Sequence, residues 1–360
     1  ALRIVDMAVA GSRLYCATLG GQIFAFNATN GQRLWLREAE PNLEVKSGSL
    51  VATERFVSLC SEVPAKVFVF DTADTETASS VFPFPGVDAR LTREPAVDGS
   101  RSALFALIGD RQVFAIRFDP LGEMWSKMLD FSVDRILLDE AGSHLVVLPL
   151  TGARWGRTRG ARILCLDART GRELWTTSAP SQPLASAFLD FDTLYLGSAT
   201  ETELRITALD LHAGHLKWLA QLPRGYDLIG LHAAGAYIAA GYVADPDQFC
   251  ISLIDRTSGR VVDTQRVHGA LWSSMQVYQG TLCAATNRGL FAFGFPFRGE
   301  AAVQLQQALL QPAQSAAQLS YLASLCTRTG QDERAAALLE LAARQSNLDD
   351  DVLLRIHEQL

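Results

Sequence analysis

The apolar positions of the chain fall into short runs that are separated by turn residues. Residues 4–9 form the first run, and residues 13–18, 22–27 and 32–37 form the next three. Glycine-containing pairs separate these runs, and glycine supplies the backbone freedom that tight hairpins need. Runs of this length between such turns predict four short antiparallel strands joined by hairpins.

The same order of runs recurs along the chain, and a turn followed by tryptophan marks each copy. The copies are Gly31 with Trp35, Gly171 with Trp175 and Gly214 with Trp218, then a looser Gly122 with Trp125 and a degenerate Gly259 without tryptophan. Successive glycines are 91, 49, 43 and 45 residues apart, so the unit has about 45 residues and the first interval holds two units. Four strands in a repeat of this length are typical of a β-propeller blade.

The repeats predict a mainly β fold, a seven-bladed β-propeller of four-stranded antiparallel blades over residues 1–298. The expected blades are 4–38, 47–84, 93–130, 132–179, 184–222, 226–268 and 271–297. The last blade has three clear strands, and its outer strand is expected at Phe295–Phe297 or in residues that precede Ala1. Eight blades remain the alternative count.

The pattern changes from strand to helix at Gly299, so residues 299–360 are predicted to form a C-terminal α-helical segment. Its middle part resembles a tetratricopeptide (TPR) repeat. The matching positions are Leu319, Leu322, Ala323, Cys326, Gly330, Ala335, Leu339 and Ala342. The resemblance implies a protein-binding helical pair that packs on the propeller or belongs to a longer array; a generic helical hairpin is the alternative.

The turn motif carries a second resemblance. A strand ending in Leu166-Asp167, then Thr170-Gly171 and Trp175, resembles the repeats of the PQQ-like β-propeller family, and the likeness extends over residues 1–297. The resemblance implies that the repeat tryptophans dock one blade against the next. These structural residues are Trp35, Trp125, Trp175 and Trp218.

Enzymes of the PQQ-like family hold the quinone with Ca²⁺, usually over a vicinal Cys-Cys disulfide. This chain has no Cys-Cys pair, and no acidic cluster clearly supplies the oxygen ligands that Ca²⁺ requires. We therefore expect a non-enzymatic member with no cofactor and no metal. His212 and His215 are read as solvated turn residues rather than as a metal pair.

The net charge indicates which class of partner the chain can bind, and the cysteines indicate its compartment. Lys and Arg number 32 against 39 Asp and Glu, a net charge of −7, so nucleic acid is not an expected partner. No apolar run reaches the roughly 18 residues of a membrane span.

The six cysteines form no CxxC pair, and five lie in apolar runs, which predicts buried free thiols and a reducing, cytoplasmic compartment. A bridge between Cys16 and Cys283, at matching repeat positions, stays open.

One insertion carries candidate binding residues. Residues 151–162, TGARWGRTRGAR, interrupt the fourth blade with arginines around a tryptophan, the residue types that dominate protein interface hot spots. The candidates are Arg154, Trp155, Arg157, Arg159 and Arg162. A solvated hairpin and a phosphate-binding loop are the alternatives.

Together these features predict a non-catalytic protein–protein interaction scaffold in a multiprotein assembly. It would bind proteins through the C-terminal helices and the 151–162 loop. The alternative is a quinone- or ligand-binding propeller enzyme or sensor with its site at the central channel. Bound quinone or metal in the purified protein would discriminate between the two.

Overall fold

The computed structural model describes residues 3–294 with short gaps, together with a few residues of the C-terminal segment. The gaps are 41–42, 44, 46–47, 74–78, 87–90, 92–94, 101, 151–161, 181–183, 200–202, 223–224, 226, 246–247, 270–274, 279–280 and 287–288. The described residues after 294 are Leu319, Leu322, Ala323, Cys326 and 336–338. The chain forms two compact units: residues 1–200 with 205–219, and residues 201–204 with 220–360.

Five four-stranded sheets succeed one another through the first unit, and each is an antiparallel meander in sequence order. Sheet 1 contains β1 (Ile4–Ala10), β2 (Arg13–Thr18), β3 (Gln22–Asn27) and β4 (Arg33–Glu38). Sheet 2 contains β5 (Leu50–Ala52), β6 (Phe56–Ser61), β7 (Lys66–Asp71) and β8 (Ser80–Pro83). Sheet 3 contains β9 (Ala96–Asp98), β10 (Ala103–Ile108), β11 (Gln112–Phe118) and β12 (Leu121–Met128).

Sheets 4 and 5 repeat this pattern. Sheet 4 contains β13 (Val133–Leu138), β14 (His144–Pro149), β15 (Arg162–Asp167) and β16 (Glu173–Ser178). Sheet 5 contains β17 (Leu184–Asp190), β18 (Thr193–Ala199), β19 (Leu204–Asp210) and β20 (Leu216–Leu222). The boundary between the two units falls within sheet 5.

Two sheets follow in the second unit. Sheet 6 contains β21 (Asp227–Ala234), β22 (Tyr237–Asp245), β23 (Gln248–Asp255) and β24 (Val261–His268). Sheet 7 contains three described strands, β25 (Gln276–Tyr278), β26 (Thr281–Thr286) and β27 (Gly289–Gly294). The second unit has its own buried cluster, in which Phe249, Ile251 and Leu253 pack with Met275.

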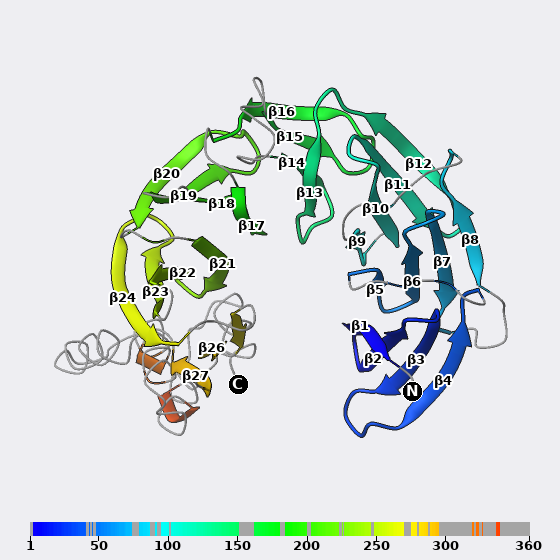
Figure 1. Ribbon diagram of the computed structural model, residues 1–360, viewed down its shortest axis with the longest axis horizontal. Coiled ribbons are helices and arrows are strands. Elements are labelled where there is room, and N and C mark those ends of the chain that lie inside the picture. Colours follow the sequence, from blue (N-terminus) through cyan, green and yellow to red (C-terminus); the bar gives the residue numbers. More distant parts are fainter. Residues whose placement is uncertain are drawn as a thin grey trace, which may run out of the picture. The chain divides into compact units, whose positions relative to one another are not determined.

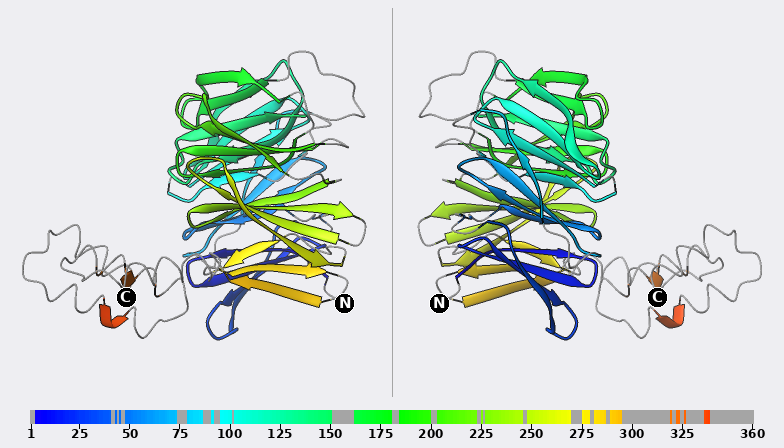
Figure 2. Two further views of the ribbon diagram at one scale, coloured as in Figure 1. Left: turned by 90° about the vertical axis from the view of Figure 1, so that its left-hand side faces the viewer. Right: turned by 90° about the vertical axis from the view of Figure 1, so that its right-hand side faces the viewer.

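In the first unit, consecutive sheets lie side by side through their first strands. Strand β1 contacts β5, β5 contacts β9, β9 contacts β13 and β13 contacts β17; in the second unit β21 contacts β25. For the first unit, Figure 1 shows the first strand of each sheet on the inner side of the series and the fourth on the outer side. Figure 2 shows the twist of the strands within each sheet, as expected for L-amino acids.

The core of the first unit lies between the sheets rather than inside any one of them. Separate buried clusters join sheet 1 to sheet 2, sheet 2 to sheet 3, sheet 3 to sheet 4 and sheet 4 to sheet 5. The middle strands β6 and β10 are buried along their whole length. Burial on both faces explains why β10 is a continuous apolar run and why β6 shows no alternation, although β6 also contains the buried residues Ser58 and Ser61.

Four of the turns between a third and a fourth strand share one hydrogen-bond network. The residue that ends the third strand accepts backbone N–H groups with its side-chain oxygen, and its carbonyl oxygen accepts the N–H of the turn glycine. The pairs are Asn27 with Gly31, Asp167 with Gly171, Asp210 with Gly214 and Asp255 with Gly259. All four glycines have φ between 69° and 71°, a region that side chains disfavour, so the motif requires glycine there.

A β-bulge follows the turns of sheets 1, 4 and 6. The register shifts beside the residue that pairs with the repeat tryptophan, as in Ala25 with Trp35 and Cys165 with Trp175. Sheets 3 and 6 have the same shift at the same place. A bulge adds one unpaired residue and re-aims the next side chain, here the tryptophan.

The predicted strand order and the antiparallel four-stranded sheets are confirmed for six sheets. The expected outer strand of the last blade, Phe295–Phe297, and the boundary at residue 298 lie outside the described residues. The described residues of the C-terminal segment are helical, and the predicted TPR-like arrangement otherwise falls outside them. Within the described part of the chain, no helix has the length and apolar character needed to span a bilayer.

The turn glycines give a direct test of how sheets are joined. A Cβ on Gly171 would lie 2.8 Å from the Trp125 ring, whereas a Cβ on Gly31 meets nothing within 4 Å, although both residues have nearly the same φ. We expect G31A to lose about 1 kcal/mol of unfolding free energy through backbone strain alone. G171A should lose about 2–4 kcal/mol because the tryptophan must also move. Equal losses in urea unfolding would contradict the Trp–Gly contact.

Candidate functional site

Two repeat tryptophans join consecutive sheets in the same way. The Trp125 ring lies against Gly171, and its indole N–H donates to the Ala168 carbonyl oxygen at 2.9 Å. The Trp175 ring lies against Gly214, and its indole N–H donates to the Leu211 carbonyl oxygen at 2.6 Å. Both acceptors lie three residues before the turn glycine, so each tryptophan binds the same feature of the next sheet.

The other two predicted docking tryptophans have different surroundings. Trp35 is half-buried, packs on Tyr15 and lies under the guanidinium of Arg37 at 5.1 Å. Trp218 is buried and packs on Tyr195 of the same sheet. All four tryptophans lie on outer strands. Trp35, Trp125 and Trp175 belong to or border the buried clusters between sheets, and Trp218 is itself buried.

The second residue after each tryptophan lies on the same side of the strand, because side chains alternate along a strand. Arg37 donates from Nη1 to the Asp71 carbonyl oxygen at 3.2 Å, in sheet 2. Lys127 donates from Nζ to the Gly171 carbonyl oxygen at 3.3 Å, in the turn of sheet 4. In sheet 4 this position is Thr177, which is too short to reach the turn of sheet 5.

A pocket of about 340 Å³ opens between sheets 4 and 5 where that longer side chain would lie. Its buried wall consists of apolar residues and two hydroxyls, and its rim is exposed. The lining residues are Ile163, Thr177, Ser178, Pro180, Leu196, Ser198, Arg205, Thr207, Leu209, Gly214, Leu216 and Leu219. This volume lies within the range of pockets that bind small ligands or single side chains.

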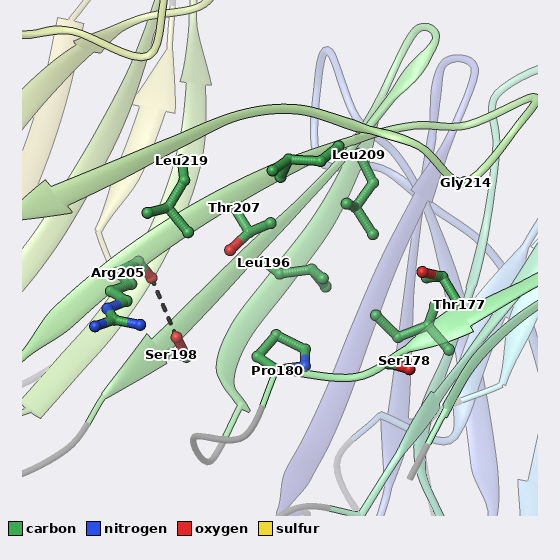
Figure 3. Close-up of a pocket in the computed structure, with 12 residues that line it drawn as sticks. Thr177, Ser178, Pro180, Leu196, Ser198, Arg205, Thr207, Leu209, Gly214 and Leu219 are labelled. Atoms are coloured by element: carbon green, nitrogen blue, oxygen red, sulfur yellow. Dashed lines mark hydrogen bonds between the residues drawn. The ribbon is translucent and has the colours of Figure 1, made fainter. Parts of the chain in front are cut away.

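The two ends of the pocket differ in character. Figure 3 shows Gly214 and Thr177 at one end and Arg205 with Ser198 at the other, where the Ser198 hydroxyl donates to the Arg205 carbonyl oxygen at 3.5 Å. Along the rim, Leu216 is 61% exposed and Leu219 is 52% exposed. The arrangement offers apolar contact area with polar groups at its ends, which suits binding rather than bond making.

A polar cluster lies elsewhere on sheets 4 and 5. The Asp139 carboxylate accepts hydrogen bonds from the backbone of Ser143 and His144, and His144 Nδ1 lies 2.9 Å from it. The His212 ring packs edge-on against His144, with centroids 4.9 Å apart. Burial acts to raise the pKa of Asp139, but the hydrogen bonds from His144 and Ser143 outweigh it and lower the pKa overall.

The predicted loop candidates fall mostly outside the described residues. Arg154, Trp155, Arg157 and Arg159 lie there, so their proposed binding role stays a prediction. Arg162 begins β15, pairs with Asp130 at 2.7 Å and lies 5.8 Å from the centroid of the Phe131 ring. Sequence reasoning missed the pocket, although the change from Arg37 and Lys127 to Thr177 at one repeat position was a readable signal.

The six cysteines carry free thiols, and five are buried. Burial raises the pKa of the thiols of Cys60 and Cys165 to about 12, so both stay protonated and unreactive near neutral pH. Among the described residues, no group of three or more His, Cys, Asp or Glu side chains gathers to hold a metal ion.

Sheets of four antiparallel strands joined by their first strands define a repeat protein of the β-propeller class. The family model described as outer membrane protein assembly factor BamB matches residues 122–296. The repeats in that range are thus similar to those of the PQQ-like, BamB-like family, in agreement with the resemblance carried by the turn motif.

Solved structures agree on the fold. BamB from Moraxella catarrhalis matches with a TM-score of 0.56 at 18% sequence identity, covering 82% of this chain and 84% of that chain. The computationally designed Ika8 protein matches with a TM-score of 0.51 at 12% identity, covering 82% and 96%. A search of curated proteins finds no match. At these identities the structural likeness shows the fold alone.

Trp175 allows the inter-sheet contact to be measured. We expect W175A to lower the unfolding free energy by about 3–5 kcal/mol, the usual cost of removing a large buried aromatic side chain. W175F keeps most of the ring contact and loses the hydrogen bond to Leu211, so its loss should be smaller, about 1–2 kcal/mol. A loss below about 1 kcal/mol for W175A in urea unfolding would refute the docking role.

Asp139 gives an expected pH dependence. Because its pKa is lowered in the folded state, its charged form stabilises the fold above the ordinary carboxyl pKa of about 3.9, and this contribution is lost as pH falls below it. D139N should cost about 1–2 kcal/mol at pH 7 and should reduce the fall in stability on acidification. Melting temperatures of both proteins, measured side by side between pH 7 and pH 3, test this. An equal fall in melting temperature for the two proteins on acidification would contradict it.

Proposed function

We propose that this chain is a non-catalytic scaffold that binds proteins as a component of a multiprotein assembly. The observation that carries the proposal is the open pocket between sheets 4 and 5 with exposed leucines on its rim. Apolar contact area beside a preformed hollow is what a docked protein segment needs, because burying side chains such as Leu216 and Leu219 supplies the affinity.

The comparisons support this function at the level of the family. The matching family model is named for an assembly factor of outer membrane proteins, and a solved BamB has a similar fold. However, 1533 chains of known structure match, so a fold this widely shared does not identify a partner.

The full architecture we propose is a seven-bladed ring followed by TPR-like helices over 299–360. In this arrangement the C-terminal helices and the 151–162 loop, with Arg154, Trp155, Arg157 and Arg159, supply further protein contacts. The support is the 45-residue repeat for the ring, and the Arg and Trp content for the loop.

We also propose that the chain works without a catalytic site or cofactor and in the cytoplasm. The free thiols support a reducing compartment. The net charge of −7 supports protein partners over nucleic acid.

The rim leucines give the test. We expect L216D/L219D to abolish capture of the partner that the parent chain cross-links in an extract of its source cells, while the melting temperature stays within a few degrees. M128D is the matched control, because Met128 is a 65% exposed apolar residue on the outer strand of sheet 3, away from the pocket. Its capture should be unchanged. Equal capture by all three proteins, quantified by mass spectrometry, would exclude the pocket rim as the docking site.

A further inference from the structure

The pocket between sheets 4 and 5 lies at the position where two other sheet junctions have a basic side chain. At the sheet 1 to sheet 2 junction, the position two residues after tryptophan holds Arg37; at the sheet 3 to sheet 4 junction it holds Lys127. Lys127 donates to the carbonyl oxygen of the turn residue Gly171, and Arg37 donates to that of Asp71, which ends β7 in the following sheet. The equivalent residue at the sheet 4 to sheet 5 junction is Thr177, and there the space is open.

The surroundings of that space match a lysine or arginine side chain along its length. Gly214, the counterpart of Gly171, lines the end at which the tryptophan docks. The buried residues Ile163, Leu196 and Leu209 form an apolar wall suited to a methylene stem, since long basic side chains lay their stems on apolar surface.

We propose that this pocket binds a lysine or arginine side chain of a partner protein, which occupies the place that Arg37 and Lys127 fill at two of the other junctions. The inference rests on the proposed scaffold function and names the chemistry of its partner. The stem lies along the apolar wall and the charged group reaches the turn around Gly214. Arg205 lines the opposite end, and its positive charge repels a second cation there. The charged group of the partner therefore lies at the Gly214 end.

The exposed rim determines which segment can deliver this side chain. Leu216 and Leu219 border the opening on strand β20, so an apolar residue next to the basic one would pack on them. The site therefore selects a segment in which a basic residue adjoins an apolar one. A free acidic peptide lacks the cation that the turn carbonyls accept.

Small probes test the pocket directly on the full chain. Nα-acetyl-lysine-N-methylamide should bind saturably with a dissociation constant of about 1 mM, typical of a small fragment in a preformed site. Nα-acetyl-norleucine-N-methylamide has a similar apolar chain without the amine, and it should bind at least about tenfold more weakly. Chemical-shift titration measures both. Equal binding of the two probes, or no saturation by the lysine probe to about 10 mM, would overturn the proposal.

One variant closes the pocket from within. T177K places the chain's own lysine where Lys127 lies at the preceding junction, so we expect it to abolish lysine-probe binding and to leave the melting temperature unchanged or higher. T176K is the matched control: Thr176 is the exposed neighbour on the opposite face of β16, so it adds the same charge and should leave probe binding unchanged. Probe binding to T177K with the parent affinity would refute the site.

The outcomes separate this inference from the proposed function. If L216D/L219D loses the cross-linked partner while T177K keeps it, the scaffold function stands and the basic-side-chain site is wrong. If the lysine probe binds the parent and not T177K, but L216D/L219D keeps the partner, the pocket binds a basic side chain and the docking function is wrong.

Discussion

The contact between an indole and a turn glycine sets the spacing of sheets 3, 4 and 5, on which the pocket and the inter-sheet core around it depend. The middle strands of these sheets are apolar on both faces, so each sheet must be covered on both sides to be stable. Trp125 on Gly171 and Trp175 on Gly214 set how closely neighbouring sheets approach, because glycine alone leaves room for the ring. The indole N–H adds a directional bond that aligns one sheet with the next.

The same contact explains where binding becomes possible. Once the tryptophan has fixed the spacing, the side chain two residues later either spans the gap between sheets or leaves it open. Arg37 and Lys127 span it, and Thr177 does not. A site thus arises at one junction by a change of side-chain length, with no change in the backbone plan of the repeat. Function in such a protein resides in the positions that depart from the repeat.

Much of the fold could be predicted from the sequence because its signals are local. Residues 13–18 and 22–27 were expected as strands and coincide with β2 and β3, since glycine turns bound each apolar run. The bulge before the tryptophan could not be predicted, because it is an offset between two paired strands rather than a property of either one. The pocket could be predicted only in part. The change from Arg37 and Lys127 to Thr177 can be read in the sequence, but the open space also depends on the distance between sheets 4 and 5.

The tryptophan and the glycine that receives it belong to different repeats, and sheets 4 and 5 each carry both a receiving glycine and a tryptophan. Excision of a whole repeat at a turn would therefore remove one donor and one acceptor together, and the newly adjacent repeats would still be complementary. Duplication would preserve the match in the same way. The number of sheets can thus change by unequal recombination without redesign of any contact, whereas loss of a single glycine cannot be compensated within its own repeat.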